Sequence, residues 1–249
     1  MLTVEGAACR LGQRGASQPE ELVERAHKQG YRALALTDEC SVAGVVSAHV
    51  AAKKIGLKLL IGSQFSVAVP EPSGDDAPGP FSLGVLACNL NGYGNLCDFI
   101  TKLRRTSEKG TYQLNLGDIA SDELADCVVV ATPVPGSPDA QLVGLARRLL
   151  THFTGRCWLG VELLRQLDDE MWLHKQLRGA SDLSAIPLVA VGAVYMHVRS
   201  RKALHDVMTA IRARHLRPTC AASPMKWQAG AGPKACRQRS RRRSSKSCN

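Results

Sequence analysis

The sequence predicts an α/β fold in which strands and helices alternate and the strands form a mainly parallel barrel. The alternation is clearest in residues 33–65, where an apolar strand, an Ala- and Val-rich helix that stops at Gly56 and a second apolar strand follow one another. The same rhythm recurs up to about residue 212. Repeated strand–helix units imply a parallel sheet, and this many units favour a barrel over an open sheet.

The individual elements are expected in a regular order. Ser17 with Glu20 predicts a capping box, and Pro19 suits the first turn of a helix that stops at Gly30. Apolar runs then predict strands at residues 32–37, 57–61 (extending towards Val69), 82–88, 127–131, 157–163 and 187–194. Helical periodicity predicts helices at residues 42–55, 94–107, 139–152, 168–178 and 200–212. Residues 70–80, rich in Pro and Gly, predict a loop.

Length and composition fit one cytoplasmic domain. A chain of 249 residues holds one barrel, and no apolar run approaches the roughly 20 residues that span a bilayer. The N-terminus lacks the long apolar core of a secretion signal. None of the nine cysteines forms a Cys-x-x-Cys pair, so we expect reduced, buried thiols at Cys40, Cys88, Cys127 and Cys157 rather than a metal cluster.

The positive charge is confined to the C-terminal part of the chain. Eleven of the 32 lysines and arginines, and none of the 22 acids, lie in residues 212–249. The tail therefore carries +11 and the remainder −1, so the composition does not support a basic DNA-gripping face on the folded part. We expect a divergent N-terminus at residues 1–14, one domain at residues 15–212 and a disordered basic low-complexity tail at residues 213–249.

Five segments in order resemble the N-terminal PHP domain of bacterial error-prone DNA polymerases, relatives of the replicative polymerase III alpha subunit. The segments are residues 15–23, 33–65, 91–96, 158–163 and 196–207. The resemblance implies a distorted (β/α)7 barrel. Residues 1–14 contain no His and no aromatic residue where the family has its first strand and metal motif, so we expect the barrel to be incomplete there.

The resemblance also implies a set of metal ligands, most of which this chain lacks. Active members hold divalent metal, Mg, Zn or Mn, for phosphoester hydrolysis. Asp38 matches an acidic position of the family, but Glu39 stands where active members have His and Gln64 where they commonly have Glu. Ala193 and Tyr195 replace the Asp and His of a Gly-Asp-Val-His-Met-His motif. We therefore expect a degenerate site without metal, with Asp38 and His197 as weak remaining candidates.

Plainer structural roles compete for the surviving residues. Asp38 is as well placed to cap the helix that begins near Val42 as to bind anything. Glu162 lies in an apolar strand, where an ion pair is a simpler role than catalysis. His197 belongs to the polar start of a helix. No nucleophile elbow and no Walker loop offers an alternative active site.

Four explanations compete for the tail that follows Arg212. We favour translation out of frame, because the family pattern stops in mid-helix and GC-rich DNA read out of frame is rich in Arg, Ala, Pro and Ser codons. A solvated disordered tail comes second, a nucleic-acid-binding arm third and a nuclear localisation signal last, given the bacterial resemblance. The arm would use Arg237, Arg239, Arg241, Arg242 and Arg243.

The functional prediction is a PHP-domain fragment of an error-prone DNA polymerase that itself lacks polymerase activity. By resemblance, the parent is a nucleotidyltransferase for DNA repair, replication and translesion synthesis after DNA damage. Its partners would be the remainder of the polymerase and DNA, with no membrane partner, and no oligomeric state follows from the sequence. The alternatives are a free-standing PHP-type metal-dependent phosphoesterase and a nucleic-acid-binding remnant that uses the arginine-rich tail.

Overall fold

The computed structural model describes residues 6–9, 15–67, 79–120, 122–163 and 168–215. The chain divides into two units, Met1–Ile211 and Arg212–Asn249. The first unit holds the sheet and its helices. Of the second unit, only the last turn of helix α7 (Lys202–His215) is described.

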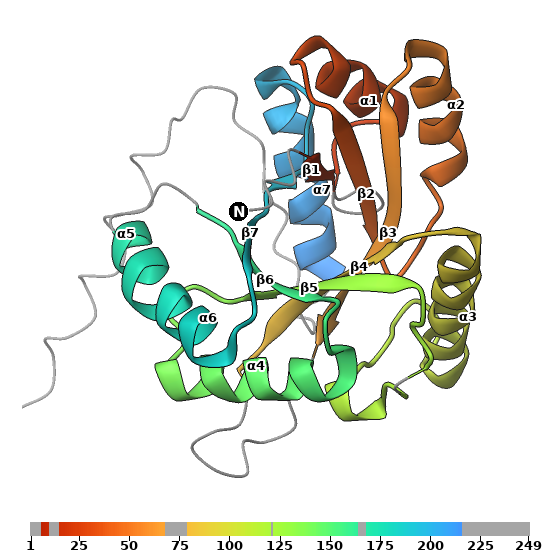
Figure 1. Cartoon of the computed structure of the whole chain (residues 1–249). Coiled ribbons are helices and arrows are strands. Elements are labelled where there is room, and N and C mark those ends of the chain that lie inside the picture. The colour runs from red at the N-terminus through yellow and green to blue at the C-terminus, as the bar shows by residue number, and fades with distance from the viewer. Residues whose placement is uncertain (1–5, 10–14, 68–78, 121, 164–167, 216–249) are drawn as a thin grey trace, which may run out of the picture. The chain divides into compact units, whose positions relative to one another are not determined.

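The first unit is built on one eight-stranded sheet with the order β7-β6-β5-β4-β3-β2-β1-β8 (Figure 1). Most neighbouring strands are parallel, as predicted, but β4 runs antiparallel to both β3 and β5. The strands are β1 (Gly6–Cys9), β2 (Ala33–Glu39), β3 (Lys58–Val67), β4 (Phe81–Ala87), β5 (Cys127–Pro133), β6 (Cys157–Val161), β7 (Leu188–Ala190) and β8 (Ala193–Val194).

The two outermost strands of this sheet are consecutive along the chain. β7 pairs with β6, and β8, only two residues further on, pairs with β1. The segment predicted as one strand over residues 187–194 is thus broken at 191–192, and its two halves join opposite ends of the sheet. The sheet therefore curls round on itself, which confirms the predicted distorted PHP-type barrel.

The expectation of a missing first strand is wrong for residues 6–9. Gly6–Cys9 forms β1 and pairs in parallel with Ala33–Leu36 of β2, while Ala8 and Cys9 pair with β8. Backbone hydrogen bonds make these pairings, so they need neither the histidines nor the aromatic residues that the family carries there. A first strand is therefore present, but its residues 6–8 (Gly-Ala-Ala) have no side chains that could bind a metal.

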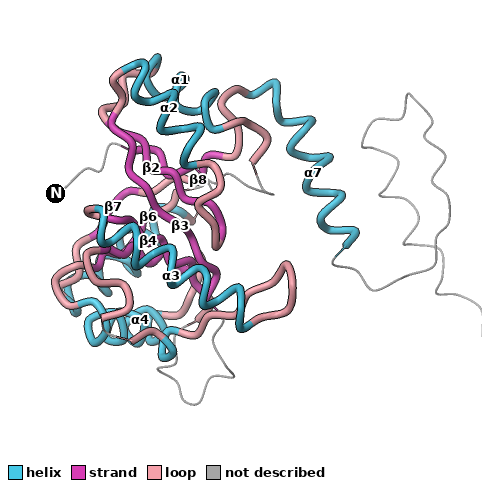
Figure 2. The backbone as a smooth tube through the Cα atoms, turned by 90° about the vertical axis from the view of Figure 1, so that its right-hand side faces the viewer, coloured by secondary structure: helices cyan, strands magenta, loops and turns pink. Residues whose placement is uncertain are grey.

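Helices α1 to α6 lie around the sheet, and α7 extends away from it (Figures 1 and 2). None of those described is both long and apolar enough to cross a lipid bilayer. They are α1 (Pro19–Lys28), α2 (Val45–Ile55), α3 (Leu90–Thr106), α4 (Asp139–Phe153), α5 (Asp169–Met171), α6 (Arg178–Ser184) and α7, with a π-helical segment at Trp172–Leu177 and 3₁₀ turns at Leu116–Asp118 and Arg199–Arg201. The single helix predicted for 168–178 is therefore three consecutive segments that run on to Ser184.

Helix α1 begins one residue later than the sequence indicated. Its N-cap is Gln18, which forms a capping box with Glu21, and Pro19 occupies the first turn. The predicted pair Ser17 and Glu20 is wrong by one position, because Ser17 has another partner, described below. The shift leaves the buried face of Leu22, Val23 and Ala26 as expected.

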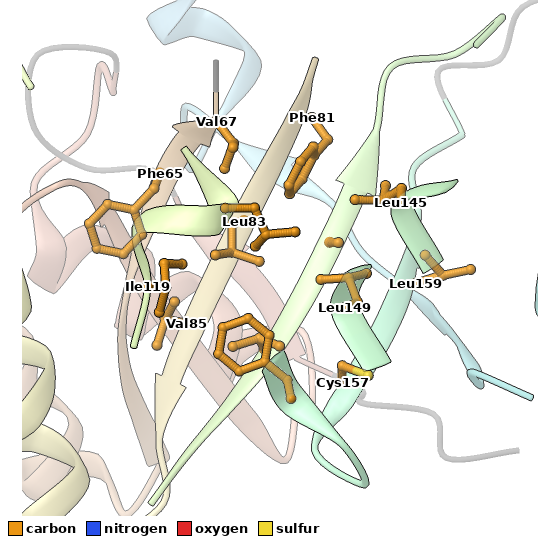
Figure 3. Packing of buried hydrophobic residues seen from close by; sticks show 14 of the residues in the cluster. Phe65, Val67, Phe81, Leu83, Val85, Ile119, Leu145, Leu149, Cys157 and Leu159 are labelled. Carbon is orange, nitrogen blue, oxygen red and sulfur yellow. The ribbon is translucent and has the colours of Figure 1, made fainter. Parts of the chain in front are cut away.

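The core lies between the outer face of the sheet and the helices. The larger cluster packs alternate residues of β3, β4 and β5, among them Phe65, Leu83 and Val129, against α3, α4 and α6 (Figure 3). A smaller cluster packs Leu34 and Leu36 of β2 against α1 and α2. The intervening residues of β4 and β5 are only half buried. This half-buried side is here called the inner face.

Candidate functional site at the carboxyl ends of β2 and β3

Strand β2 places its two final carboxylates on opposite faces of the sheet. Asp38 shares its side with Leu34 and Leu36, and its side chain is buried (2% exposed). Its Oδ2 accepts a hydrogen bond from the backbone N–H of Gly44, at 3.2 Å, just before α2. Asp38 therefore holds the start of α2, which is the structural role that the sequence left open.

Glu39 lies on the inner face and is held by hydroxyl groups. Its Oε1 accepts hydrogen bonds from Tyr112 Oη at 3.0 Å and from Ser66 Oγ at 3.1 Å. The Tyr112 oxygen in turn accepts from the backbone N–H of Ser66 at 2.7 Å. Burial, together with the Glu39 charge, raises the pKa of the Tyr112 hydroxyl, so it stays protonated and can donate.

Gln64 is the parallel neighbour of Glu39 in β3 but points its amide to another partner. Its side-chain nitrogen donates to Ser82 Oγ of β4. Ser63, the residue before Gln64 in β3, is fully buried, and its hydroxyl donates to the backbone oxygen of Asp38 at 2.8 Å. The carboxyl ends of β2, β3 and the start of β4 are therefore joined by side-chain hydrogen bonds.

Arg104 of α3 clamps the turn that follows β2. Its guanidinium donates to the carbonyl oxygen of Cys40 at 3.2 and 3.3 Å, to that of Glu39 at 3.4 Å and to that of Thr111 at 3.3 Å. It also lies 5.5 Å from the centre of the Tyr112 ring. Cys40 has a φ of 47°, an unusual value for a residue with a side chain, so this turn needs such support.

The second half of the expected site lies on the β8–α7 connection. Ala193 is in β8, and the carbonyl oxygen of Tyr195 accepts from the backbone N–H of Ala16 at 2.7 Å. The Tyr195 ring lies beside that of His205, with 5.2 Å between ring centres. Tyr195 is thus occupied by structural contacts.

His197 joins this connection to the start of α1. Its Nδ1 lies 2.7 Å from Ser17 Oγ, and its backbone N–H donates to the same oxygen at 2.9 Å. Glu21 Oε2 lies 3.6 Å from His197 Nδ1, and Glu21 Oε1 lies 2.6 Å from Arg201 Nη2. The hydrogen bond from the backbone N–H of Gln18, and then the nearby Arg201 and His197, lower the pKa of Glu21, so Glu21 is charged at neutral pH. Because the Ser17 hydroxyl is engaged by His197, it does not cap α1.

These residues do not fit a metal ion. The weak candidates Asp38 and His197 bond to different segments, Gly44 and Ser17, and Glu39 is occupied by Tyr112 and Ser66. Ala193 and Gln64 offer no anionic ligand. Across the part of the chain that the structure describes, no group of three or more His, Cys, Asp or Glu side chains is arranged to hold a metal.

Three buried cysteines, Cys40, Cys127 and Cys157, are favoured as neutral thiols. Burial raises the pKa of the Cys40 and Cys157 thiols and that of Cys127 to about 11. Cys88 was expected to be buried and is exposed, because it lies just beyond β4. Glu162, half buried, directly follows β6.

Several residues of the site carry no sequence signal. Tyr112 lies in an irregular loop, and Arg104 is one of three basic residues near the end of α3, so nothing in the sequence marks either. Ser66 could have been found from alternation along β3, which places it on the same face as Gln64. The tail arginines Arg237, Arg239, Arg241, Arg242 and Arg243 lie outside the described residues.

Comparison with known proteins supports the resemblance read from the sequence. The family model described as PHP domain matches residues 11–131. The chain is 46% identical over 207 residues to the error-prone DNA polymerase of Bordetella parapertussis and 44% identical over 205 residues to that of Dechloromonas aromatica. These matches cover 80% of this chain but only 19% and 18% of the relatives. The chain thus spans about a fifth of the length of these curated relatives.

Solved structures share the fold at low sequence identity. An amidohydrolase from Chromobacterium violaceum matches with a TM-score of 0.56 at 15% identity, covering 78% of this chain and 88% of that one. A proposed metal-dependent phosphoesterase from Bifidobacterium adolescentis matches with a TM-score of 0.53 at 14% identity, covering 78% and 87%. At such identities the likeness establishes the architecture and not the chemistry.

Proposed function

The chain belongs to the PHP-domain family, in the branch found in error-prone DNA polymerases, and we propose that it serves such a polymerase as a non-catalytic PHP module. In this role it supports the polymerase portion by packing and performs no phosphoester hydrolysis itself. The work of the complete enzyme is DNA synthesis by nucleotidyl transfer, in translesion synthesis, repair and replication of damaged DNA in the cytoplasm.

One observation carries the non-catalytic part of the proposal. Glu39 stands at the position in β2 where the resemblance implies a metal ligand, and its Oε1 accepts hydrogen bonds from the hydroxyl groups of Tyr112 and Ser66. A metal ion bound through Glu39 would find no second anionic ligand at Gln64 or Ala193, and missing ligands lower the affinity for metal. The free-standing phosphoesterase is the weaker alternative for the same reason.

Metal loading tests this directly. After incubation of the purified chain with Zn²⁺ or Mn²⁺ and removal of excess, we expect substoichiometric metal by mass spectrometry and no hydrolysis of p-nitrophenyl phosphate. The matched variant Glu39→His, Gln64→Glu, Ala193→Asp, Tyr195→His restores ligand types at all four positions and should retain more metal than the unmodified chain. One metal per unmodified chain, together with hydrolysis, would overturn the proposal.

The partnership with a polymerase is tested by exchange. The Bordetella parapertussis polymerase, with its matching region replaced by residues 15–212 of this chain, should extend a primer across an abasic site at a rate comparable to the parent. The matched control lacks that region altogether and should be unstable or inactive, because apolar surface that the module covers would be exposed. An exchanged polymerase as poor as the deletion would contradict the structural role. DNA contact in this scheme comes from the polymerase portion.

A further inference from the structure

Among the described elements, α2 and α3 are consecutive helices with β3 and β4 between them. β3 pairs directly with β4 in antiparallel fashion, a pairing that does not require the crossover helix of a parallel pair. A groove of about 580 Å³ is lined by residues of α2, β3 and the start of α3. In Figure 1, α2 and α3 stand on the same side of the sheet, next to β3. The groove therefore lies between two helices on one side of the sheet, over β3.

Exposed apolar side chains gather at this groove. Val46 and Val50 of α2 are 74% and 49% exposed, and Leu90 at the start of α3 is 82% exposed. The groove floor is β3, with Leu59 and Ile61 only partly buried. Scattered exposed apolar residues are ordinary, but a group that rims one groove marks a surface that another element covers. One turn apart on α2, Val46 and Val50 form a stripe separate from its buried residues Val45, Ala48 and Ala52.

The charge around the groove selects among possible occupants. Its lining includes Lys58 and no acidic residue, and Lys53, outside the lining, lies one turn beyond Val50 on α2. The chain's own tail, residues 212–249, has eleven cations and no acid, so its charge opposes binding here. A second copy would set Lys53 and Lys58 against the same residues across a two-fold axis, which is equally unfavourable.

We propose that this groove binds an amphipathic α-helix with an apolar stripe and acidic flanks, supplied by another polypeptide. The helix would lie between α2 and α3, with its apolar residues on Val46, Val50 and Leu90 and its carboxylates beside Lys53 and Lys58. The groove's shape and charge carry this inference, so it stands whether or not the chain serves a polymerase.

The probe is a fluorescein-labelled 18-residue peptide with leucines at helical spacing and glutamates on both flanks. We expect saturable binding to the full chain by fluorescence anisotropy. The same peptide with lysines in place of the glutamates should bind at least about tenfold more weakly. Val46→Asp with Leu90→Asp should weaken the glutamate peptide by at least about tenfold as well.

Leu183→Asp is the matched control, since Leu183 is also exposed (78%) but lies on α6 and does not line the groove. It should bind the glutamate peptide like the unmodified chain. Equal binding of both peptides, or an equal loss for Leu183→Asp, would overturn the proposal. A dimer in solution that Val46→Asp and Leu90→Asp dissolve would assign the groove to a second copy and overturn it too.

Discussion

The variant Phe65→Ala is expected to lose about 3–5 kcal/mol of unfolding free energy. Phe65 is fully buried in β3 and meets Phe99 of α3 edge-on, with ring centres 5.3 Å apart. Truncation removes buried apolar area and leaves a cavity between the sheet and α3, which the rigid strands cannot close. Figure 3 shows Phe65 among the core residues of the neighbouring strands. Urea unfolding followed by circular dichroism measures the loss.

Phe65 also connects the core to the candidate site. Its ring meets the Tyr112 ring edge-on at 6.2 Å, and Tyr112 carries the hydrogen bond to Glu39. Phe65→Ala should therefore also loosen the loop that holds Tyr112. Tyr31→Ala provides the matched control, because Tyr31 is partly exposed (39%) and lies outside the core clusters. A loss below about 1 kcal/mol for Phe65→Ala would show that this ring is not packed as described.

The order of elements was predictable because the signal for each is local. Apolar runs and helix stops such as Gly56, which adopts a left-handed φ of 73° in the structure, depend only on neighbouring residues. Strand β1 was not predictable, since Gly6–Cys9 has no strong strand signal and gains its partners, β2 and β8, from distant parts of the chain. The antiparallel course of β4 is likewise decided by tertiary pairing.

The candidate site was predictable only where residues stand at strand ends. Asp38, Glu39 and Gln64 were located from the strand–helix pattern, and alternation places Asp38 and Glu39 on opposite faces. Their partners were not, because Tyr112 and Arg104 come from 65 to 73 residues away and carry no motif. Ser17 shows the same limit. Its local pattern predicts a cap, but a contact 180 residues away engages it instead.

The variant Arg104→Met is expected to lose about 2–3 kcal/mol of unfolding free energy. The substitution removes the charged donor and leaves the backbone carbonyls that it bonds without that hydrogen-bond partner. The carbonyl oxygen of the buried Cys40 accepts two of these hydrogen bonds, and Cys40 has a left-handed φ. Such a backbone conformation is strained and depends on the surrounding contacts, so the loss of Arg104 should destabilise the turn after β2. Hydrogen exchange should report the change locally, with faster exchange at the Cys40 amide, which bonds to the Gln64 carbonyl.

Two further variants separate geometry from charge. Arg104→Lys keeps the cation but loses the planar fork that reaches the carbonyls of Glu39, Cys40 and Thr111 together, so most of the loss should remain. Arg105→Met removes the exposed neighbouring cation on the same helix and should change stability by no more than about 0.5 kcal/mol. If Arg104→Lys were fully stable, charge alone would support the turn. If it is not, a hydrogen-bonded clamp formed by Arg104 organises the turn at the carboxyl end of β2.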